Sequence, residues 1–407
     1  MQILGNTQFN TAPSYFMHID INSCFATIEQ QANPLLRYKP VGVSTTSKRN
    51  GIILASSIEA KKYGIKVGTR VADAKKICPQ ITIVNPDPNK YRYVHHRLRE
   101  ILGHYTNEFY PKSIDEFILN FTSCPAFDQG LIKVGKEIKQ RIKDEIGDYI
   151  TVSIGISKNR FLAKTASNIK KPDGLEEITE HNYLQVFRNI ELIALCGIGT
   201  QSLEKLKSMG IYTTLDLYHA DPHYLKCTFG SVIGYYWHLR LRGYEIEDYK
   251  PTRKSFSNQA AISPAITRFS DLEPILSKLV EKVGFRLRKH GYKTQGIFLA
   301  LRYKNQQYWH VSKKTQTIFD SRDLYKEILR LYEQAPKNPI TLASVGCFNL
   351  VALEQSQLKL FENAQRQHTL VTCMDTINKK WGNFVIKPGI MISKKEYVPD
   401  SIGFGNV

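Results

Sequence analysis

Residues 110–121 read YPKSIDEFILNF, a stretch in which two adjacent carboxylates, Asp115 and Glu116, stand between two apolar runs. Strand-forming residues on both sides of a short polar segment predict a β-hairpin, with FILNF as its second strand. On its own, an acidic pair in such a turn is more often a polar loop than a functional site. Its meaning therefore depends on what the rest of the chain brings next to it.

The segments around this hairpin alternate in type. Apolar patterning predicts strands over 15–21 and 150–156, and a helix that begins after Ser23, a candidate N-cap. Helices are also expected before the hairpin, after it and after the last strand, over 88–109, 130–146 and 158–170. Together these segments give the order β-α-β-β-α-β, and residues 40–79 read as a small α/β insertion with its own hairpin and two short helices.

Asp20 lies near the C-terminal end of the first expected strand. In a β-α-β-β-α-β sheet that strand neighbours the central hairpin, so we expect Asp20 to meet Asp115 and Glu116 at one edge. Three clustered carboxylates without an evident compensating cation repel one another and favour a bound metal. Mg²⁺ prefers oxygen ligands, and two such ions about 3.5–4 Å apart assist an in-line phosphoryl transfer. This chemistry is typical of polymerases and nucleotide cyclases.

The charge of the chain indicates the partner of such a site. The 407 residues contain 56 Lys and Arg against 37 Asp and Glu, a formal net charge of +19. Residues 252–352 hold 17 Lys and Arg and 7 Asp and Glu, a net of +10, which is more than half of the excess. A polyanion such as nucleic acid is the expected partner, and a basic surface that serves solubility alone is the alternative.

The composition is that of a multidomain protein that does not enter a membrane. At ordinary domain sizes, a chain of this length predicts roughly two to four domains. No apolar run approaches the ~20 residues that a membrane-spanning helix needs, and the N-terminus lacks the pattern of a secretory signal. The cysteines are scattered and include no CxxC pair. We therefore expect reduced thiols and a cytoplasmic location.

Four segments occur in an order and at a spacing that resemble one family. They are MHIDINSCFATIE (17–29), SIDE (113–116), TVSIGISKNRFLAKTASNIKKPDGL (151–175) and LCGIGTQSLEKLKSMGIYTTLDL (195–217). On these segments the chain resembles bacterial Y-family translesion DNA polymerases over nearly its whole length. Its fingers segment looks like that of the catalytic subunit of DNA polymerase V, whereas the rest is similar to DNA polymerase IV as well.

The resemblance implies a multidomain α/β and α+β fold: a right hand of palm, small fingers and helical thumb, with an additional little finger. The expected domains are a palm over 14–23 and 88–174, fingers over 24–87, a thumb with a helix-hairpin-helix over 175–245, an α+β little finger over 252–352 and a C-terminal tail over 353–407.

The resemblance also implies the catalytic residues. Asp20, Asp115 and Glu116 would be the catalytic metal ligands, joined by the backbone carbonyl of Ile21. They would hold two Mg²⁺ ions, for which Mn²⁺ can substitute. Phe25 falls where the family has its steric gate, an aromatic ring under the sugar of the incoming nucleotide.

Two lysines, Lys61 and Lys164, correspond to positions that bind the nucleotide triphosphate in the family. In the fingers this chain departs from the pattern, because many members have a tyrosine and an arginine where it has Ile58 and Lys61. Ile58 cannot donate a hydrogen bond, and Lys61 lacks the bidentate fork of arginine. We therefore expect weaker nucleotide binding or an altered pose.

The CGIG segment resembles the hairpin of a helix-hairpin-helix motif, in which Gly197 and Gly199 let backbone N–H groups approach a DNA phosphate. Glycines that simply end helices are the alternative. Further DNA phosphate contacts are expected within the basic region, at Arg253, Lys254, Arg286 and Arg288.

Residues 357–361 read QLKLF and resemble the peptide with which bacterial polymerases bind the sliding clamp. Leu358, Leu360 and Phe361 would enter a hydrophobic pocket of the clamp, and Gln357 would supply hydrogen bonds. The alternative is that these residues pack onto the core of the last domain.

The function implied by the resemblance is DNA-dependent DNA synthesis of low fidelity across damaged template bases, in DNA repair and the SOS response. The expected partners are primer-template DNA, a dNTP and the bacterial sliding clamp, and the need for an accessory subunit stays open. A non-catalytic adaptor for DNA and clamp is one alternative, disfavoured by the three carboxylates but kept open by Ile58 and Lys61. A nucleotide cyclase is the other, and it would have no use for the basic domain or the clamp peptide.

Overall fold

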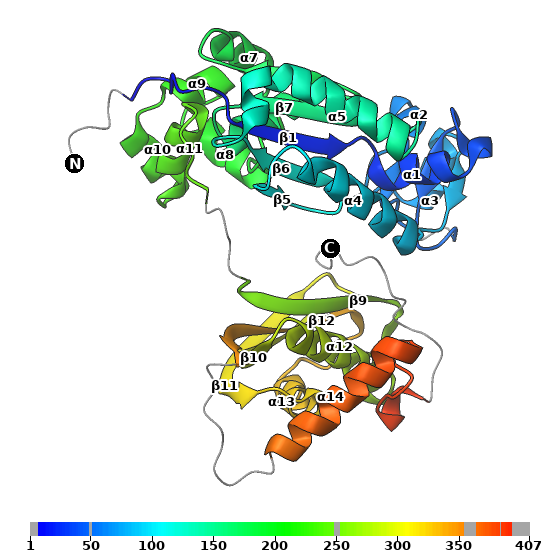
Figure 1. The fold of residues 1–407 in the computed structure, drawn as a ribbon. Helices are drawn as coiled ribbons and strands as arrows, with labels where there is room; N and C mark the ends of the chain where they lie inside the picture. The colour runs from blue at the N-terminus through cyan, green and yellow to red at the C-terminus, as the bar shows by residue number, and fades with distance from the viewer. Residues whose placement is uncertain (1–6, 49–50, 248–252, 354–363, 383, 393–407) are drawn as a thin grey trace. The chain divides into compact units, whose positions relative to one another are not determined.

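The computed structural model describes residues 7–48, 51–247, 253–353, 364–382 and 384–392. Contacts divide the chain into two compact units, one of Met1–Asp248 with Ser401–Val407 and one of Tyr249–Asp400. Each unit combines a β-sheet with packed helices (Figure 1). In the part of the chain that is described, no helix has both the length and the apolarity to cross a membrane.

A five-stranded sheet forms the centre of the first unit. Its order is β5-β6-β1-β7-β8, with β1 at Phe16–Ile21, β5 at Phe109–Pro111, β6 at Glu116–Asn120, β7 at Val152–Ser157 and β8 at Leu175–Ile178. β1 pairs antiparallel with both β6 and β7, and β8 adds a parallel edge strand. The predicted β-α-β-β-α-β order is thus confirmed, with the first strand beside the central hairpin.

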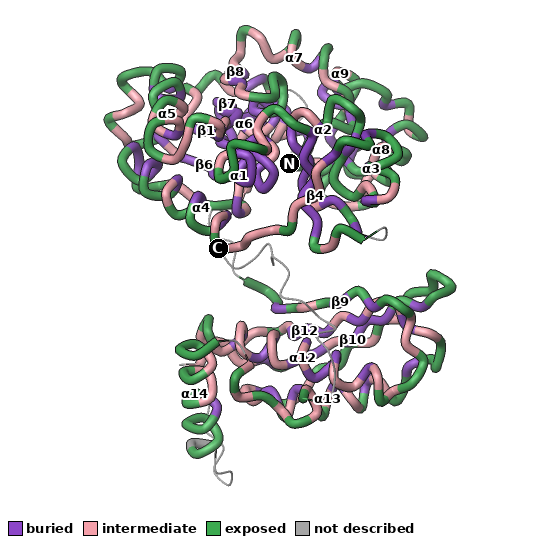
Figure 2. Tube along the Cα trace, turned by 90° about the vertical axis from the view of Figure 1, so that its right-hand side faces the viewer, coloured by how far each residue is buried: buried purple, intermediate pink, exposed green. Residues whose placement is uncertain are grey.

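Helices cover both faces of this sheet. The apolar sides of α4 (Pro88–Gly103) and α5 (Leu131–Glu145) share one buried cluster with Met17, Ile19 and Ile21 of β1. On the other face, α6 (Arg160–Ile169) packs against β7 so closely that a Cβ on Gly155 would lie 2.0 Å from the Ala163 carbonyl oxygen. Figure 2 shows β1 and β7 as largely buried, whereas α5 exposes its outer side. α4 ends earlier than predicted because residues 104–108 form the turn into β5.

The predicted insertion between β1 and α4 is a small three-stranded sheet with helices. Its elements are α1 (Cys24–Ala32), η1 (Pro34–Leu36), β2 (Val41–Val43), β3 (Ala55–Ser56), α2 (Ile58–Lys62), α3 (Val71–Ile77) and β4 (Thr82–Val84). β2 and β3 form the expected antiparallel pair, while β4, which is too short for a sequence pattern, pairs parallel with β2. Ser23 precedes α1 with a φ of 53° and makes no capping hydrogen bond through its side chain, so the predicted N-cap interaction is absent.

Residues 183–241 are helical, as their spacing predicts. The helices are α7 (Tyr183–Asn189), η3 (Leu192–Ala194), α8 (Thr200–Ser208), α9 (Thr214–His219), α10 (Pro222–Phe229) and α11 (Ile233–Leu241). Residues 7–14 run along them: Phe9 stacks on Tyr183 with ring centroids 4.1 Å apart and belongs to the same buried cluster as Trp237 and the α6 residue Leu162.

The second unit is a four-stranded antiparallel sheet in the order β11-β10-β12-β9. The strands are β9 (Ser255–Ile266), β10 (Tyr292–Tyr303), β11 (Tyr308–Ile318) and β12 (Ile340–Ala352). One sheet face packs on α12 (Phe269–Lys289) and α13 (Ser321–Tyr332) through a buried cluster that includes Leu276, Leu299 and Ile328. This is the α+β arrangement that the sequence predicts for the basic region.

Residues 364–381 were expected within a polar tail but form helix α14 (Ala364–Trp381). Arg288 of α12 donates to both carboxylate oxygens of Asp375, over 2.6 and 2.9 Å, and Phe319 stacks on His368. A charged pair and a ring stack hold the helix, together with the buried Val371. Because part of this docking does not depend on apolar residues, the apolar pattern of α14 in the sequence is weak.

Candidate active site

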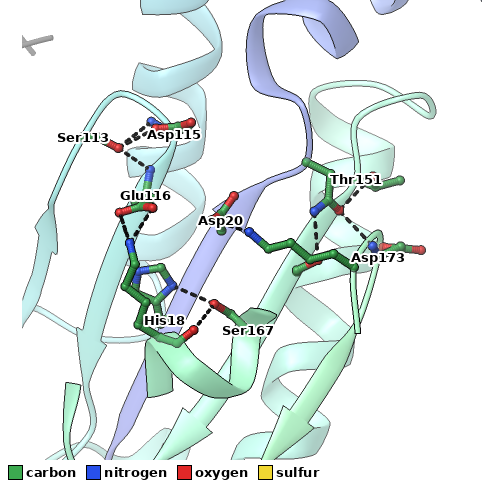
Figure 3. A network of polar contacts seen from close by, with 12 residues as sticks. His18, Asp20, Ser113, Asp115, Glu116, Thr151, Ser167 and Asp173 are labelled. Carbon is green, nitrogen blue, oxygen red and sulfur yellow. Dashed lines mark hydrogen bonds and ion pairs between the residues drawn. The ribbon is translucent and has the colours of Figure 1, made fainter. Parts of the chain in front are cut away.

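Two strand ends bring the three candidate carboxylates together. β1 and β6 pair so that Asp20 lies directly opposite Glu116, and the Ile21 N–H donates to the Asp115 carbonyl over 3.0 Å. Because side chains alternate along a strand, the burial of Ile21 with the α4 and α5 cluster directs Asp20 to the opposite face. Figure 3 shows Asp20, Asp115 and Glu116 at the same end of the sheet.

Asp20 is held by a lysine from the segment after α6. Its side chain is 13% exposed, and Lys171 Nζ donates to Oδ2 over 2.7 Å. Burial raises the pKa of Asp20, the charges of Glu116 and Asp115 raise it further, and Lys171 opposes the rise. The pKa of Asp20 is raised overall, so Lys171 does not fully offset the effects of burial and of the two neighbouring carboxylates. A further positive charge would therefore stabilise the ionised form of Asp20.

Glu116 is also paired. Lys164 of α6 donates to its two oxygens over 2.6 and 2.7 Å. Burial alone would lower the pKa of Lys164, but the hydrogen bond and the charge of Glu116 raise it. Asp115 accepts a hydrogen bond from the hydroxyl of Ser113 in the same turn (Figure 3).

The expectation that the carboxylate cluster lacks a compensating cation is therefore wrong. Lys164 pairs with Glu116 and Lys171 pairs with Asp20. Both lysines come from a helix and loop that are distant in sequence from the carboxylates, so no local pattern indicates these pairs. The cations neutralise a negative edge that would otherwise be repulsive.

The residues at this edge fit a divalent cation by their chemistry. They offer carboxylate and carbonyl oxygens, which are the ligands that Mg²⁺ and Mn²⁺ prefer. Within the described ranges, no three acidic, histidine or cysteine side chains are already gathered as a metal cluster, because each carboxylate turns to its own partner. Metal binding would therefore require Asp20 and Glu116 to exchange a lysine for the ion.

A cavity of about 530 Å³ adjoins the carboxylates. Asp20 and Asp115 line one part of it, and Lys61 and Lys171 supply positive charge. Burial lowers the pKa of Lys61, and the nearby charge of Lys171 lowers it further. An anion bound in the cavity would stabilise the charged form of Lys61.

Phe25 and Ile58 complete this cavity. Phe25 lies in α1, is 4% exposed, and stacks on Tyr91 of α4 with centroids 4.4 Å apart. The Tyr91 hydroxyl donates to Glu29 over 2.9 Å, which holds this ring in place. Phe25 is thus a fixed apolar wall close to Asp20, whereas Ile58 offers the cavity no hydrogen bond.

The sequence interpretation missed Lys171 and selected Lys164 instead. Lys164 lies on Glu116, while Lys171 lies on the wall of the cavity. Two signals could have indicated Lys171: it immediately precedes Pro172, which disfavours a helical conformation at residue 171, and it belongs to the segment NIKKPDGL. A lysine beside a turn is, however, solvent-exposed surface in most proteins.

The two glycines of the CGIG segment lie between η3 and α8. Gly197 has a φ of +100°, a conformation that favours glycine, and Gly199 is the exposed residue that precedes the first turn of α8. The helix, turn and helix expected at this point are therefore present.

The four predicted arginine and lysine contacts fall into different environments. Lys254 is exposed, and the guanidinium groups of Arg253 and Arg286 lie over the Phe256 ring, at 4.8 and 5.9 Å from its centroid. Arg288 is different: its side chain is 6% exposed and binds Asp375 and Ser321. The expectation that Arg288 faces DNA does not fit this burial.

The predicted clamp peptide, Gln357 to Phe361, lies outside the described residues.

Comparisons with known proteins agree with this arrangement. Residues 19–168 match the impB/mucB/samB family model, and residues 253–360 match the C-terminal domain model of the same family. DNA polymerase IV 1 of Bacillus subtilis is 30% identical over 393 residues, 93% of each chain. DNA polymerase IV of Francisella tularensis is 29% identical over 351 residues, 85% of this chain and 98% of its own.

The fold is similar to that of a solved Y-family DNA polymerase chimera. The TM-score is 0.73 at 22% identity, over 83% of this chain and 99% of the other.

Proposed function

Because the chain belongs to the Y family of DNA polymerases, the impB/mucB/samB family, it is a low-fidelity DNA-directed DNA polymerase for translesion synthesis, and we propose that Asp20, Asp115 and Glu116 are its catalytic carboxylates. The observation that carries the assignment is the register of β1 and β6, which sets Asp20 opposite Glu116 beside a cavity lined by three lysines. Its substrates are a primer-template DNA and a dNTP, and it depends on divalent metal as its family does.

We propose two Mg²⁺ ions, replaceable by Mn²⁺, with Asp20 and Asp115 as shared ligands. The Ile21 carbonyl and Glu116 would complete the protein donors. Two bound ions would promote attack by the primer 3′-hydroxyl and neutralise the leaving pyrophosphate. The work of the chain itself is to hold its oxygens at one strand end, where β1 pairing keeps Asp20 and Glu116 in register.

The lysines would divide between the nucleotide and the carboxylates. Lys61 and Lys171 line the cavity, so we propose that they contact the triphosphate. Lys171 donates a hydrogen bond to Asp20 and would move to a phosphate oxygen when Asp20 binds metal. Lys164 would have to leave Glu116 to contact the nucleotide. We therefore propose that Lys164 mainly neutralises Glu116.

We propose Phe25 as the steric gate that excludes a ribose 2′-hydroxyl. Its support is the fixed stacking on Tyr91 and its place in the cavity wall. Replacement by a smaller side chain, Phe25→Val, should raise incorporation of ribonucleotides relative to deoxyribonucleotides in a single-nucleotide extension assay.

DNA would be held at the exposed backbone around Gly197 and Gly199 and by Arg253, Lys254 and Arg286 of the basic unit. Phosphate contacts of this kind give affinity without sequence reading and fall steeply with salt. The QLKLF peptide would bind the bacterial sliding clamp, and Leu360→Ala/Phe361→Ala should abolish stimulation of primer extension by added clamp while leaving extension without clamp unchanged.

Primer extension tests the catalytic assignment. Purified protein with primed template, Mg²⁺ and dNTPs should extend the primer, and Asp115→Ala/Glu116→Ala should not. Asp73→Ala, which removes an acid whose side chain is 52% exposed, is the control and should extend like the natural chain. Equal extension by the double variant would contradict the assignment of the carboxylates.

A further inference from the structure

A buried histidine faces Glu116 with one nitrogen that has no hydrogen-bond partner. His18 lies on β1 two residues before Asp20 and therefore on the same face of the strand; it is fully buried. Its Nε2 is 3.9 Å from Glu116 Oε2, which is too long for a hydrogen bond, and it makes no other one. Figure 3 shows His18 between Glu116 and Ser167.

The surroundings of the other ring nitrogen, Nδ1, indicate which tautomer of His18 is favoured. His18 Nδ1 lies 3.2 Å from the hydroxyl oxygen of Ser167, which can donate or accept. If Nδ1 carried the proton, the lone pair of Nε2 would point at a carboxylate and stay unpaired. If Ser167 donates to Nδ1, the Nε2–H points at Glu116, and the electrostatic interaction becomes attractive.

The second arrangement requires the Ser167 hydroxyl to turn, because it donates to the Lys164 carbonyl oxygen of the same helix over 2.8 Å. Turning the hydroxyl to His18 costs that carbonyl little, since a helical carbonyl at this position already accepts a backbone N–H. Burial lowers the pKa of His18 well below its usual value, and the charges of Lys164, Lys171 and Lys112 lower it further, which agrees with the neutral ring that both arrangements require.

We propose that His18, held in the Nε2–H tautomer by Ser167, is a positioning residue that orients Glu116 for the divalent cation. The proposal rests on the role of Glu116 given above. While Glu116 accepts hydrogen bonds from Lys164, its carboxylate is too far from His18 Nε2 for a hydrogen bond. When it turns from Lys164 to a cation, a movement of about 1 Å brings Oε2 within hydrogen-bond distance of Nε2–H.

A donor fixed behind a ligand carboxylate reduces the orientations that the carboxylate can sample and strengthens its hold on the metal. His18 suits this task because it is fully buried and lies against Ser167 of α6, so the ring does not move with the ligand. No proton is transferred, and no charge changes on His18.

The tautomer is tested on the whole chain without metal or DNA, by ¹⁵N NMR of protein labelled in histidine. His18 should show a protonated Nε2 and an unprotonated Nδ1. His95 is the internal reference, because its Nδ1 lies 2.9 Å from the Ile114 carbonyl oxygen, which only accepts, so its proton must be on Nδ1. A His18 ring with its proton on Nδ1 would overturn the proposal. This readout needs no catalysis, so it stands apart from any failure of primer extension.

The positioning role is tested with variants that differ at Nε2. Gln can present an amide N–H where the ring has Nε2–H, whereas Leu cannot. We expect His18→Leu to weaken Mn²⁺ binding about tenfold, at the low end of changes behind metal ligands, in a complex with dNTP and a primer that lacks its 3′-hydroxyl. His18→Gln should retain most of the affinity.

A buried histidine of α11 serves as the control, because His238 is 2% exposed and does not line the cavity beside the carboxylates. His238→Gln should bind Mn²⁺ like the natural chain. If His18→Leu and His18→Gln bind Mn²⁺ equally well, whether weakly or normally, Nε2–H has no positioning role and the proposal is wrong.

Discussion

Lys171 Nζ lies 2.7 Å from Asp20 Oδ2, so a lysine on the wall of the proposed triphosphate site is bonded to a proposed metal ligand. The pairing explains how a buried aspartate beside two more carboxylates is tolerated. On the proposed assignment, nucleotide and metal binding would be linked: a cation on Asp20 would release Lys171, and a phosphate would give the released ammonium a new partner. Lys171 and Lys164 thus neutralise Asp20 and Glu116.

Lys171→Ala should raise the KM for dNTP roughly ten- to hundredfold, because a hydrogen bond to a charged group contributes about 1.5–3 kcal/mol. The adjacent Lys170 is exposed and makes a matched control. Steady-state single-nucleotide extension measures both variants. If Lys170→Ala and Lys171→Ala show the same KM, position 171 has no particular role in nucleotide binding.

Arg288→Ala should destabilise the second unit by about 3–5 kcal/mol, because it leaves Asp375 without its buried partner. Chemical denaturation followed by fluorescence measures this change. Arg253→Ala/Lys254→Ala should instead leave stability nearly unchanged and weaken DNA binding, with a salt slope reduced by about one per lost phosphate contact. The reverse pattern, with DNA affinity lost only in Arg288→Ala, would show that our assignment of Arg288 is wrong.

Phe9→Ala should cost about 3–5 kcal/mol of unfolding free energy, the range for removal of a buried aromatic ring. Phe9 is 6% exposed and stacks on Tyr183, and the backbone of its segment bonds to Arg242. Gln8→Ala changes the exposed neighbour and should have little effect. Urea unfolding of the two variants separates packing of the ring from any general effect of altering the N-terminal segment.

The free energy of unfolding should decrease as pH falls from the ordinary pKa of histidine toward the lowered pKa of His238. Burial lowers the pKa of His238 to about 4, and the charge of Arg242 contributes. In the unfolded chain this group titrates near its ordinary value of about 6.5. The unfolded state therefore takes up the proton first as pH falls, and folding free energy is lost between these two values.

His238→Gln does not titrate in this window, so its stability should decline less between about pH 7 and about pH 4 than that of the natural chain. Denaturation midpoints across this range measure the difference. Parallel declines in both proteins would show that His238 is not buried in its neutral form. His18, whose pKa is also lowered, remains in both proteins and cancels in the comparison.

Much of the first unit could be read from local patterns. Apolar runs with strand-forming residues identified β1 and β7, which are buried almost throughout, and apolar residues at helical spacing identified α5 and α6. The sequence analysis missed β4 and α14 for different reasons. β4 has only three residues, and α14 is held partly by an ion pair and a ring stack. Neither leaves a periodic signal.

The sequence by itself determined the chemistry available to this protein. It placed Asp20 at the end of a strand, put Asp115 and Glu116 in a hairpin, and concentrated positive charge in residues 252–352. These features depend on residue type and local period, which a single chain displays directly.

Only the tertiary structure decided which groups meet. It pairs Lys171 with Asp20 and Lys164 with Glu116, buries Arg288 against Asp375 and sets His18 behind Glu116. Each of these contacts joins residues at least 48 positions apart, and only packing of strands and helices brings them within a few ångströms. Charge and hydrogen-bond energies depend steeply on that distance, so the roles of these residues are properties of the fold.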